Sequence, residues 1–309
     1  MKARIGIIGT GWVGTSVALS TLLAGHAREL WLHDQHGEVA EGEALDLADG
    51  AAFYPRCAVR AVALAQMREA DIVVLAAGRN GRPDESRLAL LRDNAAIAAG
   101  IGQVLAGFGG IVIVVTNPVD VLTRVVAEAS GLAAERVIGT GTLLDTARLR
   151  ERLAERLGLS TQSIHAQVVG EHGDSSVMLW TGARVGGLAL RDWPGWQADE
   201  EAPLASQVRH AAYEVIRRKG ATNHAIGLVT AELIGCIAGD ERRLLPVSRV
   251  QTGACGVTGV ALSLPALVGA GGALQVVEPA MSDDERTALA ASAAVLSQAW
   301  ASLGGAGVA

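Results

Sequence analysis

The sequence "ARIGIIGTGWVG", residues 3–14, is an apolar run followed directly by the pattern G-x-G-x-x-G. An apolar run, this glycine pattern and a helical stretch behind it predict the strand, turn and helix of a dinucleotide-binding fold. Gly9 allows the tight turn, Gly11 lets the backbone approach a pyrophosphate, and Gly14 lets the helix lie against the sheet. The N-terminus of that helix then faces the phosphates with its free N–H groups.

A second apolar run, "ELWLHD", ends at Asp34, twenty residues after Gly14. A carboxylate at this position accepts hydrogen bonds from the ribose 2′-OH and repels a 2′-phosphate. The pair of motifs therefore favours NAD over NADP as the cofactor.

The first half of the chain alternates apolar runs with helical stretches. Further buried strands are expected at Asp71–Gly78, Gly110–Pro118 and Arg136–Gly141. Helices are expected at Val13–Ala24, Glu38–Ala48 and Leu88–Phe108. Continuous apolar strands separated by helices indicate a parallel sheet that is covered on both faces. The prediction is an α/β fold with a doubly wound Rossmann sheet.

The pattern changes after about residue 140. Helices are expected at Asp145–Leu157, Pro203–Lys219, His224–Ala238 and Asp283–Leu303, with strand-like runs at Leu244–Val250 and Gly259–Val268. This indicates an α+β half, so we expect an NAD-binding domain at 1–139 and a substrate domain at 140–309. Because no Pro/Ser-rich linker separates them, we expect the two halves to pack as one unit.

Composition excludes several classes of protein. The net charge is −6 and no basic block occurs, so nothing indicates nucleic-acid binding. No apolar run is long enough to span a membrane, and the N-terminal run is too short and glycine-broken for a signal peptide. The three cysteines are widely spaced and form no CxxC pair, which favours neither a zinc site nor a disulfide framework. A reducing cytoplasm is the expected location.

Three polar motifs belong together. They are "TNPVD" at 116–120, "GTGTLLDTARLR" at 139–150 and "GEHGDSS" at 170–176. Alone, "GEHGDSS" is typical of a surface turn. With the glycine loop, in this order and spacing, the chain resembles the lactate/malate dehydrogenase family over essentially its whole length. The resemblance implies an NAD-dependent enzyme for 2-hydroxy acids, a small-molecule 2-oxo acid substrate and a homodimer or homotetramer.

The resemblance also implies roles for single residues. His172 matches the family's proton donor and acceptor, and an imidazole titrates in the range that this role needs. Asp145 matches the carboxylate that orients this histidine, and Arg148 the arginine that grips the substrate carboxylate. Asn117 matches a side chain that contacts the nicotinamide ribose. Arg87, in the segment "AGRNGRPDESRLALLRDN" at 77–94, matches the arginine that polarises the substrate carbonyl.

The remaining expected site residues follow from the glycine loop and the resemblance together. The expected cofactor contacts are Gly9, Gly11, Trp12, Val13, Gly14, Asp34, Ala77, Gly78, Asn94 and Asn117.

Substrate choice is open at this point, because Gly81 stands where lactate enzymes of the family have Gln and malate enzymes have Arg. A glycine supplies no cation for a second carboxylate, and it leaves room for a longer side chain. Arg82, one residue further, is a cation that oxaloacetate would meet if the loop shifted. Thr222 matches a residue of the pocket floor and favours lactate.

The leading hypothesis is therefore an L-lactate dehydrogenase. Malate dehydrogenase and an L-2-hydroxyisocaproate-type dehydrogenase are the alternatives within the family. A non-catalytic nucleotide-binding protein is the alternative from another class, since a fold does not fix a function.

Two further residues suggest regulation. Arg150 and His165 match the pair by which many bacterial lactate dehydrogenases bind fructose 1,6-bisphosphate across a subunit interface. Arginine and protonated histidine suit a phosphate ligand. The resemblance thus implies an allosteric site for this effector.

Overall fold

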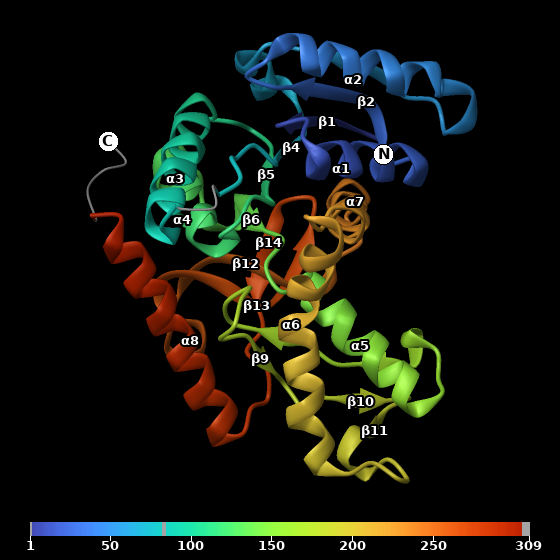
Figure 1. The fold of residues 1–309 in the computed structure, drawn as a ribbon, viewed down its shortest axis with the longest axis vertical. Coiled ribbons are helices and arrows are strands. Elements are labelled where there is room, and N and C mark those ends of the chain that lie inside the picture. Colours follow the sequence, from blue (N-terminus) through green and yellow to red (C-terminus); the bar gives the residue numbers. More distant parts are fainter. Residues whose placement is uncertain (1, 82–84, 305–309) are drawn as a thin grey trace.

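A nine-stranded sheet extends through both halves of the chain in the computed structural model, which describes residues 2–81 and 85–304. The strand order is β14-β13-β12-β6-β5-β4-β1-β2-β3 (Figure 1). The first-half strands are β1 (Ala3–Ile8), β2 (Ala27–His33), β3 (Ala58–Ala61), β4 (Ile72–Leu75), β5 (Ile111–Val114) and β6 (Val137–Gly139). All neighbouring pairs among these six are parallel. The predicted doubly wound parallel sheet is therefore confirmed.

Helices cover both faces of this parallel part. They are α1 (Trp12–Ala24), α2 (Gly37–Asp49), α3 (Arg87–Val104) and α4 (Val119–Ser130). In β4, Ile72 and Val74 pack in the core under α1 and α2, whereas Val73 and Leu75 pack in the core under α3 and α4. Side chains of a strand alternate between faces, so a sheet covered on both sides needs unbroken apolar strands. That requirement explains the apolar runs of the sequence.

The second half adds to the same sheet instead of forming a separate one. The strands β12 (Arg243–Thr252), β13 (Thr258–Gly269) and β14 (Gly272–Val276) are antiparallel, and β12 pairs with β6. Two small sheets stand beside it, made of β7 (Ile164–His165), β10 (Arg184–Val185) and β11 (Leu188–Ala189), and of β8 (Val168–Val169) and β9 (Val177–Met178). The helices of this half are α5 (Leu143–Leu157), α6 (Glu201–Lys219), α7 (His224–Ala238) and α8 (Asp283–Ser302). The shared sheet makes the two halves one packed unit.

The glycine turn after β1 has the geometry that its sequence predicts. Gly9 has φ of +95°, and a Cβ there would lie 2.5 Å from the backbone of Ala77. A Cβ on Gly14 would lie 1.8 Å from the carbonyl oxygen of Gly9. A Cβ on Gly11 would meet nothing within 4 Å. The first and third glycines are therefore required by packing, and the second borders open space.

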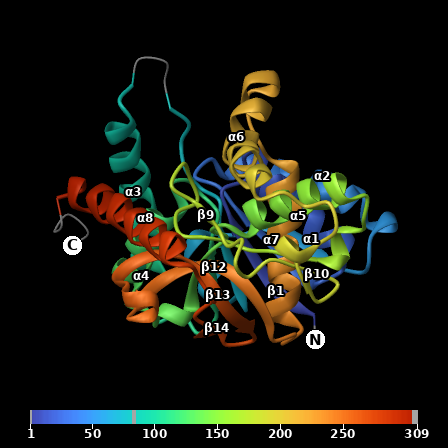
Figure 2. The same ribbon diagram turned by 90° about the horizontal axis from the view of Figure 1, so that it is seen from below.

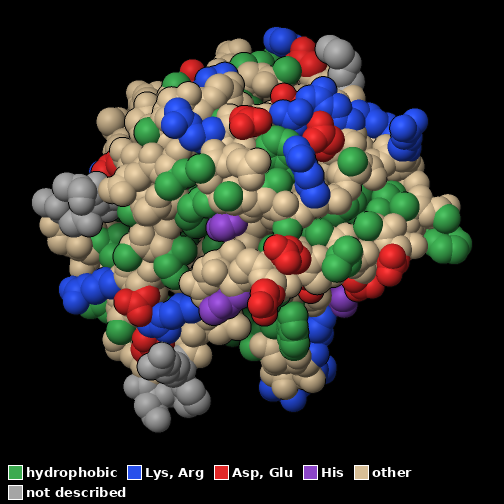
Figure 3. Space-filling model, turned by 90° about the horizontal axis from the view of Figure 1, so that it is seen from above, with side chains coloured by type: hydrophobic (Ala, Val, Ile, Leu, Met, Phe, Trp, Pro, Cys, Tyr) green, Lys and Arg blue, Asp and Glu red, His purple; other side chains and the backbone are tan. Residues whose placement is uncertain are grey.

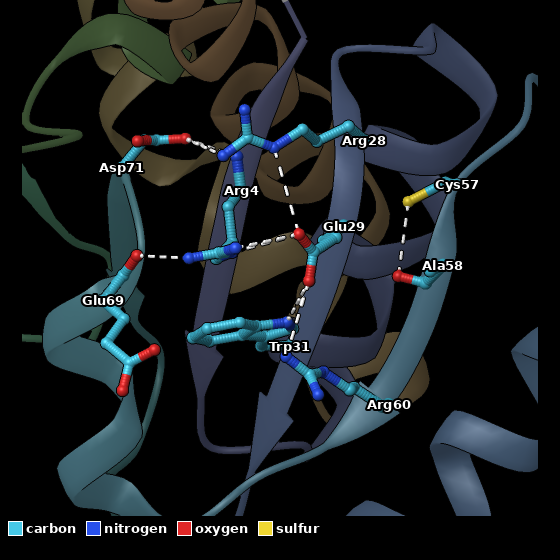
Figure 4. Close-up of polar contacts among 9 residues, drawn as sticks. All are labelled: Arg4, Arg28, Glu29, Trp31, Cys57, Ala58, Arg60, Glu69 and Asp71. Carbon is cyan, nitrogen blue, oxygen red and sulfur yellow. Dashed lines mark hydrogen bonds and ion pairs between the residues drawn. The ribbon is translucent and has the colours of Figure 1, made fainter.

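A charged cluster around Trp31 links the strands β1, β2 and β3 (Figure 4). Trp31 is 1% exposed and lies between the guanidinium groups of Arg4 and Arg60, at 4.4 and 4.7 Å from its ring. Glu29 accepts hydrogen bonds from Arg4 Nη2 at 3.0 Å and from Trp31 Nε1 at 3.1 Å. The bond from Arg4 lowers the pKa of Glu29. Because these residues come from β1, β2 and β3, the cluster links these three neighbouring strands to one another.

The described surface carries mixed charge. On the face in Figure 3, acidic and basic side chains are interspersed among hydrophobic ones. Among the described residues, no helix is long and apolar enough to cross a membrane, and no group of His, Cys, Asp and Glu is arranged to hold a metal ion. The three cysteines are free, and burial raises the pKa of Cys57 to about 11.

Candidate active site

His172 and Asp145 form a hydrogen-bonded pair in which the aspartate is buried and the histidine is half-buried. Asp145 lies in the first turn of α5 and is 6% exposed, while His172 lies in the loop between β8 and β9. His172 Nδ1 is 2.6 Å from Asp145 Oδ2, and the other oxygen, Oδ1, accepts a hydrogen bond from Arg148 Nη1 at 2.9 Å. Asp145 and Arg148 lie one turn apart on α5. The bond to His172 brings together residues that are 27 positions apart in the chain.

The pair favours the charged form of both partners. Burial by itself lowers the pKa of His172, but the Asp145 carboxylate outweighs burial and the pKa of His172 is raised. Burial by itself raises the pKa of Asp145, but His172 and Arg148 outweigh it and the pKa of Asp145 is lowered. An imidazolium beside a carboxylate is a proton donor held in one orientation.

A cavity of about 480 Å³ adjoins this pair. Its charged and polar lining comes from Asn117, Asp145, Arg148, His172, Asp174 and Arg209. Its apolar lining comes from α3 and α6, through Leu90, Leu91, Ala212 and Tyr213. These two helices project from the same side of the molecule (Figure 2). A small anionic ligand would meet two guanidinium groups there, with the imidazole beside them.

Other residues expected at the substrate end lie near this cavity or outside the described part. Asn117 follows β5 and its side-chain oxygen accepts a hydrogen bond from Val119 N at 3.3 Å. Gly81 does not line the cavity, but a Cβ there would lie 3.2 Å from Cδ2 of Leu90, which does. Arg82 lies outside the described residues. Arg87 is the first residue of α3, and its side chain also lies outside the described part.

Of the residues near the expected pocket floor, only some line the cavity beside His172. Ala212 lines it, whereas Ala211 lines a neighbouring cavity between α5 and α6. Successive helical residues point in directions about 100° apart, which explains the separation. Thr222 lies in the turn between α6 and α7 and is not among the lining residues. Its neighbour Asn223 donates a hydrogen bond to Ser16 Oγ on α1 at 3.0 Å, so this turn is held against the glycine-loop helix.

A second cavity, of about 320 Å³, lies beside the glycine turn. It is lined among others by Gly9, Gly11, Asp34, Ala77 and Gly78, all expected cofactor contacts. Asp34 accepts hydrogen bonds from the backbone N–H groups of Thr10 and His36, each at 3.0 Å. Burial by itself raises the pKa of Asp34, but these bonds outweigh it and the pKa is lowered. The structure thus places an ionised carboxylate at the edge of this cavity.

The other expected cofactor contacts do not line this cavity. Trp12 is 64% exposed at the start of α1, and neither it nor Val13 lines the cavity. Asn94 is 3% exposed, and its side chain accepts a bond from Arg79 N at 2.9 Å and donates one to Arg79 O at 3.3 Å. Asn94 therefore supports the backbone after Gly78 from behind.

Two residues at the site were not expected from the sequence. Asp120, on α4, accepts a hydrogen bond from the backbone N–H of His172 at 2.7 Å. Arg209, on α6, donates to the carbonyl oxygen of Ser176 at 2.8 Å and lines the cavity of His172. Asp120 belongs to the motif "TNPVD", which marks it as a candidate, but no pattern in the sequence distinguishes Arg209 from other helix-face arginines.

The candidate effector residues lie on adjacent segments. Arg150 Nε donates to the carbonyl oxygen of Ala166 at 3.0 Å, and His165 is exposed on β7. Burial lowers the pKa of Arg150, with a smaller contribution from the charge of Arg243. Arg150 also lines a cavity of about 420 Å³ between α1, α5, α7 and β12.

Comparison with known proteins covers nearly the whole chain. Residues 3–139 match the family model "lactate/malate dehydrogenase, NAD binding domain", and residues 142–302 match its "alpha/beta C-terminal domain". The chain is 43% identical to an L-lactate dehydrogenase of Salinibacter ruber, over 98% of each chain. It is 41% identical to L-lactate dehydrogenase 2 of Lactococcus lactis, over 89% of this chain and 90% of the relative. The crystal structure of the minor L-lactate dehydrogenase from Enterococcus mundtii superposes with a TM-score of 0.94, at 36% identity, over 99% of this chain and 98% of that one.

Proposed function

This chain belongs to the lactate/malate dehydrogenase family, and from that premise we propose that it is an NAD-dependent L-lactate dehydrogenase, reducing pyruvate to L-lactate. The observation that carries the proposal is the convergence of His172, Asp145 and Arg148 on one cavity. Similar proteins at 41 and 43% identity, both named L-lactate dehydrogenases, support the substrate. The test is NADH oxidation with pyruvate, followed by chiral analysis of the product. Formation of D-lactate, or no turnover, would contradict the proposal.

The proton in this reaction comes from His172. Its Nδ1 is engaged by Asp145, so Nε2 is the nitrogen that faces a substrate oxygen. When bound, NADH supplies a hydride to C2 of the 2-oxo acid. His172 Nε2 gives its proton to the C2 oxygen, and Asp145 stabilises the imidazolium before the transfer. In the reverse direction the neutral imidazole accepts the hydroxyl proton.

The substrate carboxylate is assigned to Arg148. One N–H of its guanidinium already binds Asp145, which fixes the plane of the group beside His172. Its other N–H groups are then available for a two-bond pair with a carboxylate. Arg87 is proposed to polarise the substrate carbonyl and Asn117 to orient the substrate, as the resemblance implies.

The cofactor is NAD, and the residues beside the glycine turn fit it. The turn has no side chain at Gly11, α1 starts directly behind it, and Asp34 supplies a carboxylate at the edge of the cavity. We propose that residues 1–139 hold this cofactor and residues 140–309 hold the substrate, with the reaction at their common edge.

NADH is expected to be preferred over NADPH by about a hundredfold in kcat/KM, because the 2′-phosphate would meet the ionised Asp34, and a like-charge contact costs several kcal/mol. The measurement is initial rate against each cofactor at matched pyruvate concentration. Asp34→Ser should lower the ratio of kcat/KM for NADH to that for NADPH. Asp49→Ser, at the exposed end of α2, should leave this ratio unchanged. Equal use of both cofactors by the wild type would remove Asp34 from the cofactor site.

Specificity is assigned to the loop around Gly81. Gly81 supplies no cation for the second carboxylate of oxaloacetate, and its missing side chain leaves room for side chains longer than the methyl of pyruvate. Broad 2-oxo acid use, including branched substrates, is therefore part of the proposal. Malate-type activity is the outcome expected if Arg82 faces the substrate instead.

Gly81→Arg is expected to raise oxaloacetate use relative to pyruvate by roughly tenfold to a hundredfold, the effect of one hydrogen bond to a charged group. The measurement is the ratio of kcat/KM for the two substrates in wild type and variant. A wild-type enzyme that already prefers oxaloacetate strongly would show that another cation recognises the second carboxylate.

Assembly and regulation complete the proposal. We propose a homodimer or homotetramer, because α1 and α7 expose Leu19, Leu23 and Leu228 beside the cavity that Arg150 lines. Light scattering that finds a monomer would contradict it.

A fructose 1,6-bisphosphate site at Arg150 and His165 would show as a lower KM for pyruvate in the presence of the effector. This decrease should be lost in Arg150→Gln. We also propose a cytoplasmic location, which cell fractionation tests.

A further inference from the structure

Arg79 is a charged residue beside the cofactor cavity that the reaction described above does not use. It lies in the segment between β4 and α3 and lines that cavity together with Gly78. Its backbone N–H donates to Asn94 Oδ1 at 2.9 Å, and its carbonyl oxygen accepts a bond from Asn94 Nδ2 at 3.3 Å. Asn94 is a buried residue of α3. The backbone of Arg79 is therefore attached to α3 through both of its polar groups.

The side chain of Arg79 binds two acidic residues around the start of the same helix. Its Nη1 donates to Glu85 Oε2 at 2.6 Å and its Nη2 donates to Glu85 Oε1, so the guanidinium and the carboxylate make two parallel bonds. Its Nε donates to Asp93 Oδ2 at 2.8 Å. A planar guanidinium with paired bonds to a carboxylate holds that carboxylate in one orientation.

Burial separates this contact from an ordinary surface ion pair. Exposed ion pairs contribute little, because water screens the charges and both side chains lose freedom. The side chains of Arg79 and Glu85 are only 26% and 15% exposed. Together with the paired geometry, this shielding makes Arg79 and Glu85 a firm connection between two parts of the backbone.

The connection fixes the place where α3 begins. Glu85 directly precedes Ser86, the N-cap of α3, whose Oγ accepts the backbone N–H of Ala89 at 3.1 Å. Arg87 is the first residue of the helix, and Leu90, in its first turn, lines the substrate cavity. A side chain that holds Glu85 therefore sets the position from which the substrate-facing part of α3 starts.

We propose that Arg79 is a positioning residue for Arg87, because it fixes the start of α3 relative to the bound cofactor. This inference rests on the proposed function, in which Arg87 polarises the substrate carbonyl. Arg79 is not among the residues that line the substrate cavity, so it acts through Glu85. The carbonyl and the hydride donor must be aligned closely, since a misplacement of about 1 Å can lower a rate by about 10²-fold.

Arg79→Ala is expected to lower kcat/KM for pyruvate by about tenfold, because the start of α3 is then no longer fixed. Glu85→Gln removes the charge from the other side of the contact and should cause a similar loss. Arg79→Lys keeps the charge without the paired bonds and should lose only about threefold. The matched control is Arg92→Ala, which removes an exposed arginine of α3 that donates to the carbonyl oxygen of Ser302. The control should keep the wild-type kcat/KM.

A double-mutant cycle shows whether Arg79 acts through Arg87. In an Arg87→Ala background, measured at higher enzyme concentration, Arg79→Ala should lower kcat/KM for pyruvate by less than about twofold, because the residue that it positions is absent. An effect as large in this background as in the wild type would overturn the proposal. The dissociation constant of NADH, measured by quenching of protein fluorescence, should stay close to the wild-type value in Arg79→Ala. A loss of NADH affinity as large as the loss of kcat/KM would also overturn it, because Arg79 would then be a direct cofactor contact.

Hydrogen exchange of backbone amides gives a readout that is independent of activity. The amides of Ala89 and Leu90 bind Ser86, through its Oγ and its carbonyl oxygen respectively. They should exchange faster in Arg79→Ala and Glu85→Gln than in the wild type, because local opening of the first turn of α3 becomes easier. Unchanged exchange of these amides in both variants would overturn the proposal. A wild-type protein that turns over no 2-oxo acid would refute the proposed function, whereas faster exchange in the variants would still show that Arg79 holds the start of α3.

Discussion

Replacing His172 with Asn is expected to lower kcat for pyruvate reduction by at least a hundredfold while NADH still binds. Asparagine keeps a polar side chain of similar reach but cannot donate a proton to the C2 oxygen. General acid catalysis contributes about 10² to 10⁴ in rate, which sets the size of the loss. The cofactor cavity beside Gly9 is formed without His172, so binding of NADH should be unchanged. Steady-state rates and quenching of protein fluorescence by NADH measure the two properties separately.

The matched control for this variant is His210→Asn. His210 is exposed on α6 and binds Ser206, outside the cavity that His172 lines. The control should keep its activity. A His172→Asn enzyme that retains more than about a tenth of the wild-type kcat would show that another group supplies the proton.

Replacing Arg148 with Lys is expected to raise KM for pyruvate by about tenfold to a hundredfold. An ammonium keeps the charge but cannot make two parallel bonds to a carboxylate, and bonds to charged groups contribute about 1.5 to 3 kcal/mol. Lysine would also give up the planar contact by which Arg148 binds Asp145. The measurement is KM and kcat with saturating NADH.

Arg152→Lys is the control for this second variant. Arg152 lies one turn further along α5 and binds the exposed Glu155, so its substitution should leave KM unchanged. An unchanged KM in Arg148→Lys would assign the substrate carboxylate to a different cation, with Arg209 the first to test because it lines the same cavity.

Much of the fold followed from the sequence because burial imposes patterns on it. Strands covered on both faces must be apolar throughout, and Gly9 admits no side chain because a Cβ there would lie 2.5 Å from the backbone of Ala77. Within the nine-stranded sheet, the two strands that were not expected, β3 and β14, lie at the edges. The short strands β7 to β11 were not expected either. The exposed, alternating or polar residues of β3 and β14, as in "AVRA" and "GALQV", carry no buried pattern. Pairing of β12 with β6 is a long-range contact that no local pattern encodes.

In the candidate site, too, some residues could be predicted from local motifs and others could not. His172, Asp145 and Arg148 were expected from their motifs, and the structure brings them together around one cavity. The contacts of Asp120 and Arg209 depend on where α4 and α6 pack against the histidine loop, which only the assembled fold determines.

We expect this enzyme to prefer a 2-oxo acid that has a single carboxylate. The most direct test of this expectation is kcat/KM with NADH for pyruvate, oxaloacetate and 2-oxoisocaproate, measured side by side. We expect the highest value for pyruvate, measurable turnover of 2-oxoisocaproate and a clearly lower value for oxaloacetate. A strong preference for oxaloacetate would contradict it and would make the enzyme malate-type.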